Sequence, residues 1–126
     1  MDELTLGERE LDIMAVLWET GAGTVGEVRE RLPVPLAYTT VLTILRNLEA
    51  KGYLSHTVDG RAHRYRPRIA QRAAQRSALK RMLSRFFSGS PELLLARLVA
   101  DGNVDAQALR EMAERVARGK HSRRTR

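Results

Sequence analysis

The stretch "TTVLTILRNLEAKG", residues 39–52, predicts a helix with two chemically different sides. At helical periodicity its aliphatic residues gather on one side and can be buried together: Val41, Leu42, Ile44, Leu45 and Leu48. The other side carries Thr39, Thr40, Thr43, Arg46 and Asn47. Surface helices usually carry Glu, Lys, Gln and Ala instead, because Thr and Asn are poorer helix formers. This polar side is therefore either a solvated face of unusual composition or a binding surface.

The net charge indicates the class of partner. Lys and Arg number 22 against 15 Asp and Glu, which gives a net charge of +7 and an isoelectric point near 10.7. Such a protein attracts polyanions, of which nucleic acid is the first candidate and a membrane surface the second. No apolar run approaches the roughly 18 residues of a membrane span, and the acidic start "MDELTLGERE" is not typical of a signal peptide. We expect a cytoplasmic, soluble protein, which favours nucleic acid.

Capping motifs predict two helices before this stretch. A Thr-x-x-Glu capping box occurs at residues 5–8 and again at 24–27. The first expected helix ends near "TGAG" (20–23) and the second at "PVP" (33–35), because Gly favours the C-terminal cap and Pro cannot donate to a continuing helix. The third runs over about residues 38–51.

The segment "YLSHTVDGRAHRYRP" then changes to strand periodicity and predicts a hairpin over residues 53–66. Asp59-Gly60 matches a two-residue turn of type I′, which requires positive φ angles. Counting outward from that turn gives the pairs Val58 with Arg61, His56 with His63 and Leu54 with Tyr65 on one face. The other face then holds Ser55, Thr57, Arg64 and Arg66.

Residues 69–118 predict further helices, broken at "SGSPE" (88–92) and "DGN" (101–103). Their apolar residues exceed what one thin layer of helices can bury, which predicts that this region dimerises. The expected interface residues are Leu79, Leu83, Phe86, Leu94, Leu98, Leu109, Met112 and Val116. The basic end, residues 119–126, is predicted to be disordered.

Three helices followed by a basic hairpin indicate a winged helix-turn-helix domain over residues 1–68, in a mainly α chain whose only β structure is the hairpin. Its third helix would enter the major groove of duplex DNA, and its hairpin, the wing, would follow the backbone or minor groove. Thr, Asn and Arg are suited to base edges, which makes Thr39, Thr40, Thr43, Arg46 and Asn47 the candidate base-reading residues. The candidate backbone or minor-groove contacts are Tyr38, Lys51, Arg61, His63, Arg64 and Arg66.

Three segments in this order resemble the penicillinase-repressor family, the BlaI/MecI/CopY type of bacterial winged-helix repressors. They are "LGERELDIMAVLWETGAGTVGEVRERL", "AYTTVLTILRNLEAKGYL" and "DGRAHRYRP", and the resemblance covers roughly residues 4–116. It implies a homodimer that represses genes from dyad-symmetric operators. In the beta-lactam branch it also implies a membrane sensor protease, whose signal leads to cutting of the repressor.

Two departures limit what this resemblance implies. The copper-responsive branch uses a C-terminal cysteine motif, whereas this chain has no cysteine, which excludes a thiolate copper sensor. In the beta-lactam branch the cut bond is typically Asn-Phe, and the matching position here reads Arg97-Leu98. The sequence therefore does not predict induction by that proteolytic specificity, nor does it name the operator, the regulated genes or the inducer.

Other functional classes have less support. No phosphate-binding glycine loop, paired His-Glu ligand motif or serine nucleophile elbow occurs, so we predict no enzymatic activity and no cofactor. His56 and His63 face one another in the expected register, but zinc normally takes four ligands, which favours structural or phosphate-contacting histidines over a metal site. Two alternatives stay open: a winged-helix module for protein contacts, and a non-specific architectural DNA-binding protein.

Overall fold

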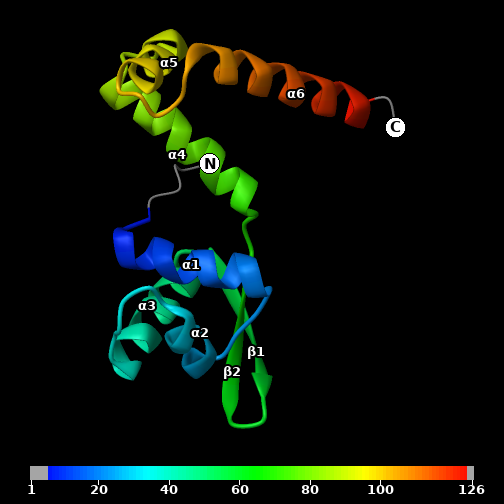
Figure 1. Ribbon diagram of the computed structural model, residues 1–126. Helices are drawn as coiled ribbons and strands as arrows, with labels where there is room; N and C mark the ends of the chain where they lie inside the picture. Colours follow the sequence, from blue (N-terminus) through cyan, green and yellow to red (C-terminus); the bar gives the residue numbers. More distant parts are fainter. Residues whose placement is uncertain (1–5, 125–126) are drawn as a thin grey trace. The chain divides into compact units, whose positions relative to one another are not determined.

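The computed structural model describes residues 6–124, with side chains as far as Gly119. Its elements are α1 (Glu8–Thr20), α2 (Val25–Arg31), α3 (Tyr38–Ala50), β1 (Leu54–Asp59), β2 (Ala62–Pro67), α4 (Gln71–Phe86), α5 (Pro91–Ala100) and α6 (Ala106–Arg124) (Figure 1). Three helices, a two-stranded hairpin and three more helices follow one another, which confirms the predicted fold class.

The apolar side of α3 lies in the core of the first compact unit, which extends to Leu79. Val41, Leu45 and Leu48 are fully buried there, as the helical pattern predicts. They pack in one cluster with buried side chains of the neighbouring elements: Ile13, Met14 and Leu17 from α1, Val25 and Val28 from α2, Leu54 from β1 and Tyr65 from β2. Burial of one side of α3 leaves its opposite side facing solvent.

The helix starts agree with the capping prediction in one case and not in the other. The Thr24 hydroxyl accepts the Glu27 N–H at 3.3 Å while the Glu27 carboxylate accepts the Thr24 N–H at 3.0 Å, which confirms the second capping box. Helix α1 instead begins after Gly7, whose N–H donates to the Glu10 carboxylate at 2.9 Å. Thr5 lies outside the described residues.

The hairpin register is shifted by two residues from the predicted one. Val58 pairs with His63, His56 with Tyr65 and Leu54 with Pro67, so the two loop residues are Gly60 and Arg61. Only Gly60, at φ 65°, has positive φ in this loop, which fits a type II′ turn rather than the predicted type I′. Because the shift is an even number, the side chains that stay in the strands keep their predicted faces, whereas Arg61 lies in the loop.

A short bridge joins the hairpin to the segment between α1 and α2. The Gly23 N–H donates to the Tyr65 carbonyl at 2.9 Å, and the Tyr65 N–H donates to the Gly23 carbonyl at 2.8 Å. Near the start of α4, the Trp18 indole N–H donates to the Ile69 carbonyl at 3.0 Å. Ala74 of α4 is also buried in this core, so the first unit continues past Arg68, where we expected it to end.

The second compact unit begins at Lys80 and contains the rest of α4 with α5 and α6. Helix α5 starts within the predicted break at residues 88–92, with Pro91 in its first turn and the Ser90 hydroxyl accepting the Leu93 N–H at 3.1 Å. Helix α6 extends to Arg124, where we expected disorder from residue 119. Lys and Arg are good helix formers and are favoured at a helix C-terminus, which explains this difference.

Replacing Leu45 by Ala should lower the free energy of unfolding by about 2–5 kcal/mol, because it empties a fully buried site in the helix that carries the polar side. Chemical denaturation followed by the fluorescence of Trp18, the only tryptophan, measures this loss. Thr43→Ala on the opposite, exposed side of α3 is the control and should change stability little. A loss below about 1 kcal/mol for Leu45→Ala would contradict this packing.

Candidate nucleic-acid interface

The polar side of α3 is exposed along its whole length. Thr39, Thr40, Thr43, Arg46 and Asn47 are all solvent-exposed. Within the described part of the chain, no hydrogen bond or ion pair engages the side chains of the three threonines or of Asn47. Four short polar side chains thus stand on one rigid helix with their hydrogen-bonding groups available to a partner.

Arg46 differs from its neighbours because it contacts the hairpin. Its guanidinium lies close enough to the phenol of Tyr65, a residue that is 1% exposed, to influence the pKa of that phenol. Burial and the nearby Glu49 carboxylate raise the pKa of Tyr65, and Arg46 partly offsets this rise. Arg46 and Tyr65 also line one groove, so the Arg46 side chain lies on the side of α3 that is next to β2.

The ends of α3 offer two more predicted contact residues. Tyr38, the first residue of the helix, is 50% exposed. Lys51, directly after the helix, forms an ion pair with Glu10 of α1 at 2.7 Å. Partial burial raises the pKa of Glu10, but the Gly7 amide and Lys51 outweigh it, and the pKa is lowered overall. Lys51 is thus engaged in holding α3 to α1.

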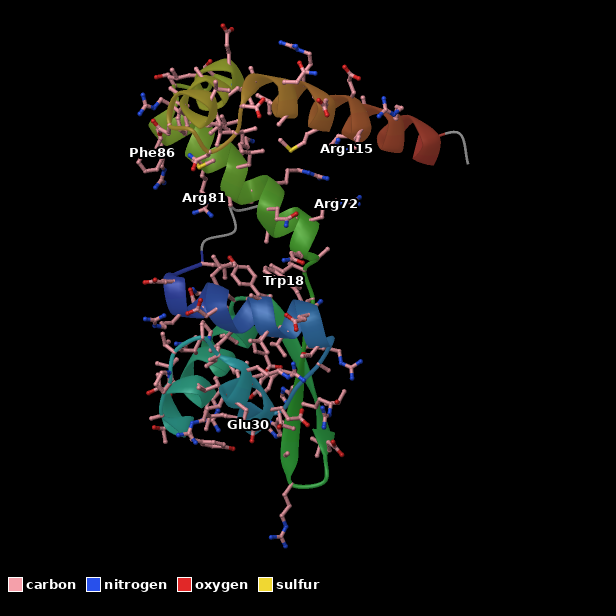
Figure 2. All side chains as sticks on the ribbon, viewed as in Figure 1. Trp18, Glu30, Arg72, Arg81, Phe86 and Arg115 are labelled. Atoms are coloured by element: carbon pink, nitrogen blue, oxygen red, sulfur yellow. The ribbon has the colours of Figure 1, made fainter. Side chains whose placement is uncertain are left out.

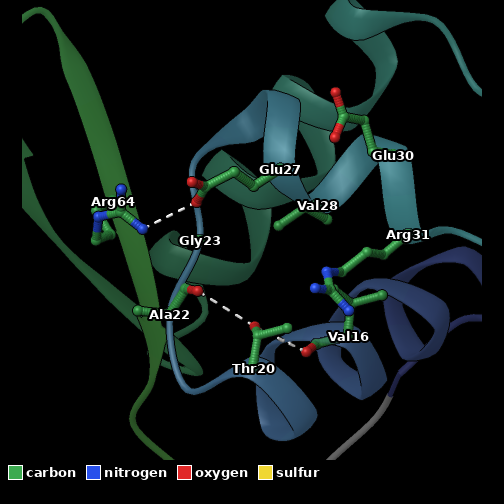
Figure 3. Close-up of a pocket in the computed structure, with 9 residues that line it drawn as sticks. All are labelled: Val16, Thr20, Ala22, Gly23, Glu27, Val28, Glu30, Arg31 and Arg64. Atoms are coloured by element: carbon green, nitrogen blue, oxygen red, sulfur yellow. Dashed lines mark hydrogen bonds and ion pairs between the residues drawn. The ribbon is translucent and has the colours of Figure 1, made fainter.

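Arg64 of β2 is bound by two carboxylates from different elements. Its guanidinium lies 2.9 Å from the Glu27 carboxylate of α2 (Figure 3). It also lies 3.1 Å from the Asp59 carboxylate at the end of β1. Hydrogen bonds to Asp59, and then to Glu27, raise the pKa of Arg64. The Thr24 amide and then Arg64 lower the pKa of Glu27. We name this set of Arg64, Glu27 and Asp59 the wing clamp.

The wing clamp borders a shallow pocket of about 320 Å³ between α1, α2 and β2 (Figure 3). Glu30 and Arg31 also line it. Its walls carry two carboxylates and two guanidiniums, so the charges are balanced and the pocket favours neither anions nor cations.

Two other hairpin arginines are in a different state from Arg64. Arg61 at the turn and Arg66 on β2 are exposed, and neither forms an ion pair with any residue from 6 to 119. They remain free to approach a polyanion. The sequence did not distinguish these two from Arg64, because the carboxylates that bind Arg64 come from other elements, and no spacing in the sequence reveals that contact.

The two histidines are stacked although they are not paired in register. The ring centroids of His56 and His63 lie 4.2 Å apart, with 11° between the ring planes. The His56 Nδ1 lies 2.6 Å from the Glu49 carboxylate of α3. Among the described residues, no group of three His, Cys, Asp or Glu side chains could hold a metal ion. Sequence reasoning missed Glu49, because nothing local to it indicates a contact with the hairpin.

The expected dimer-interface residues are exposed or partly exposed in the single chain. Phe86 is 76% exposed, Val116 69% and Leu79 46%, and Figure 2 shows Phe86 extending from the end of α4. From Lys80 to Gly119 no residue is buried. The remaining expected residues are partly exposed: Leu83, Leu94, Leu98, Leu109 and Met112. Over residues 6–124, no helix is long and apolar enough to cross a membrane.

The first unit therefore has the construction of a winged helix-turn-helix protein: three helices, an exposed polar third helix and a basic hairpin beside it. A family model described as penicillinase repressor matches residues 6–118. The chain belongs to the penicillinase repressor family.

Individual relatives agree with this membership. The transcriptional regulator BlaI of Mycobacterium tuberculosis strain H37Rv is 45% identical over 71 residues, which cover 53% of this chain and 51% of the relative. The chain thus spans about half the length of that relative. The penicillinase repressor of Bacillus licheniformis is 24% identical over 109 residues, covering 85% of each chain.

Solved structures show the same fold. The DNA-binding domain of the repressor BlaI superposes with a TM-score of 0.52 and 28% identity, covering 57% of this chain and 90% of that one. A MarR family protein from Bacillus stearothermophilus gives a TM-score of 0.55 at 21% identity, covering 98% and 78% of the two chains, and shows the fold alone.

The different states of Arg64 and Arg66 predict different salt dependences. Arg66→Ala should weaken binding to duplex DNA and reduce the slope of log K against log salt by about 0.9 for each phosphate that is no longer neutralised. Arg64→Ala should weaken binding while leaving that slope nearly unchanged, because its charge is already neutralised within the wing clamp. Fluorescence titrations at several salt concentrations give both slopes. Equal slope changes in the two variants would show that Arg64 leaves the wing clamp for a phosphate.

Proposed function

We propose that the protein is a sequence-specific DNA-binding transcriptional repressor, which acts in the cytoplasm as a homodimer on a dyad-symmetric operator. The observation that carries this proposal is α3, which buries Val41, Leu45 and Leu48 fully while its Thr- and Asn-rich side is free and exposed. The basic hairpin beside it and membership of the penicillinase repressor family support the same function.

In this proposal α3 enters the major groove. Thr39, Thr40 and Thr43 lie toward its N-terminal end, the part of a recognition helix that usually reaches base edges. A threonine offers a hydroxyl for hydrogen bonds and a methyl group for thymine, and Asn47 has the amide that suits adenine. Short side chains also let the helix axis approach the bases closely.

The second unit would supply the dimer contact. Between Lys80 and Gly119 no residue is buried, so these helices have no core of their own and expose apolar side chains to water. A second copy of the chain would cover this apolar surface. A two-fold dimer presents two α3 helices, which matches two half-sites related by a dyad.

A sensor protease pathway is a further expectation from the family, but the proposal does not include cutting at Arg97-Leu98. That bond lies inside α5, and Arg97 forms an ion pair with Asp101 one turn later at 3.1 Å. Its side chains also differ from the Asn-Phe pair expected in the beta-lactam branch.

The alternative functions make different binding predictions. A protein-interaction module would use the α3 side for an acidic partner and would bind DNA weakly, and an architectural protein would bind all duplexes alike. Selecting a preferred duplex from a random library, and then titrating it beside a scrambled duplex at fixed salt, separates the three. Our proposal predicts a preference of at least about 10³-fold for the selected duplex.

Thr43→Ala and Asn47→Ala should each weaken binding to the selected duplex by about 1–3 kcal/mol and relax the preference at one base pair per half-site. Binding to random duplex should barely change, since the backbone contacts remain. Gln75→Ala, on the exposed surface of α4, is the matched control and should change neither affinity. If Thr43→Ala and Asn47→Ala weaken binding to both duplexes by the same factor, α3 does not read bases.

Phe86→Asp should convert the full chain to a monomer, because it places a charge at the most exposed of the large apolar residues of α4. Sedimentation velocity measures the state of association. Operator affinity should fall by roughly 10²-fold or more, as the second half-site loses the benefit of effective concentration. Circular dichroism should stay unchanged, since Phe86 is 76% exposed in the single chain. A Phe86→Asp variant that remains a dimer would place the interface elsewhere.

A further inference from the structure

A groove of about 420 Å³ separates α3 from the hairpin within the first compact unit. Arg46 enters it from α3, and Arg61 and His63 enter it from the hairpin. No acidic side chain lines this groove, in contrast to the charge-balanced pocket beside the wing clamp. Three basic side chains with no carboxylate among them favour an anion.

The basic side chains are held in place by different contacts. The buried Tyr65 lines the groove together with Arg46, and Arg46 lies close enough to the Tyr65 phenol to influence its pKa. The His56 ring stacks on His63 at 4.2 Å and limits its movement. Arg61 is held by neither and has no ion pair within the described chain, so its guanidinium can adjust to a ligand.

The remaining walls of the groove have a mixed character. Val25 and Leu42 provide apolar surface on the helix side, and Ala62 provides it on the hairpin. Tyr38, half exposed at the start of α3, adds a phenol at the rim. These walls fit a ligand with two parts: an anionic group, which the basic side chains would bind, and a compact, partly apolar group, which would lie against the apolar side chains.

We propose that the groove binds one phosphodiester of the DNA backbone, with Arg46, Arg61 and His63 on the phosphate oxygens and with Leu42 and Val25 against the adjoining deoxyribose. Guanidinium groups suit this role because they donate two parallel hydrogen bonds to a phosphate. The inference rests on the proposed function, in which α3 lies against duplex DNA. It moves Arg46 from the base-reading residues to the backbone-contacting ones.

Full-length Arg46→Ala and Arg61→Ala test this assignment on the selected and the random duplex. Each should weaken binding to both duplexes by the same factor, about tenfold, and the double variant, which leaves the phosphate without an arginine, should reduce the salt slope by about 0.9 per groove. Arg46→Lys should bind more tightly than Arg46→Ala but less tightly than wild type, because lysine restores the positive charge but cannot donate two parallel hydrogen bonds to the phosphate. If Arg46→Ala weakens binding to the selected duplex only, Arg46 reads a base and the proposal is wrong.

A second measurement identifies the phosphate itself. One phosphate at a time in the selected duplex is replaced by an uncharged methylphosphonate, and each duplex is titrated with wild type and with Arg46→Ala. At one position per half-site, the replacement should weaken binding by Arg46→Ala clearly less than it weakens binding by wild type, because the variant has already lost one contact to that phosphate. Additive losses at every position would overturn the proposal.

Inorganic phosphate distinguishes a DNA backbone site from a site for a free anion. At constant ionic strength, exchanging chloride for phosphate should compete only weakly with DNA, because one free phosphate lacks the sugar and the neighbouring contacts. Tight binding of inorganic phosphate, seen as a shift of the His63 ring resonances at micromolar concentration, would instead assign the groove to a small anion. If wild type shows no preference for any duplex, the proposed function fails, whereas retained preference with unchanged Arg46→Ala affinity refutes this inference alone.

Discussion

The attachment of the hairpin to the helices through Tyr65 is the constraint on which the binding surface depends. The Tyr65 side chain is buried among the three helices, while its backbone exchanges two hydrogen bonds with Gly23. A side chain at position 23 would crowd this junction, since its Cβ would lie 3.2 Å from Val28 and 3.5 Å from Leu17. The same Tyr65 lines the groove between α3 and the hairpin together with Arg46. One residue therefore joins the core, the hairpin and the basic surface.

The arginines around this junction divide into two groups that their sequence positions do not separate. Arg64 is neutralised by Glu27 and Asp59 and fixes the hairpin to α2, whereas Arg61 and Arg66 have no acidic partner among the described residues. The hairpin thus presents two positively charged side chains, Arg61 and Arg66, that no carboxylate of the described residues neutralises. This division explains how a hairpin can be held rigidly by one arginine and still present others to a polyanion.

The sequence predicted most of the fold because local rules determine it. Helical periodicity identified the buried Val41, Leu45 and Leu48, and the Thr24–Glu27 capping box marked the start of α2. The exact hairpin pairing was missed, because Asp59-Gly60 and Gly60-Arg61 both allow a two-residue turn and only the packing of Tyr65 and Leu54 selects between them. The Glu49–His56 contact and the wing clamp were missed for a related reason: each joins residues from different elements, and no spacing in the sequence encodes that proximity.

The central claim is that α3 of each subunit lies in the major groove of one half-site. The chain has no cysteine, so a single Ala37→Cys at the exposed residue before α3 can carry an iron chelate that cleaves nearby DNA. On the selected duplex, the account predicts two symmetric clusters of major-groove cleavage whose centres are separated by about one helical turn, 10–10.5 base pairs, or a multiple of it. Cleavage spread evenly along the duplex, or a single cluster in the minor groove, would contradict it.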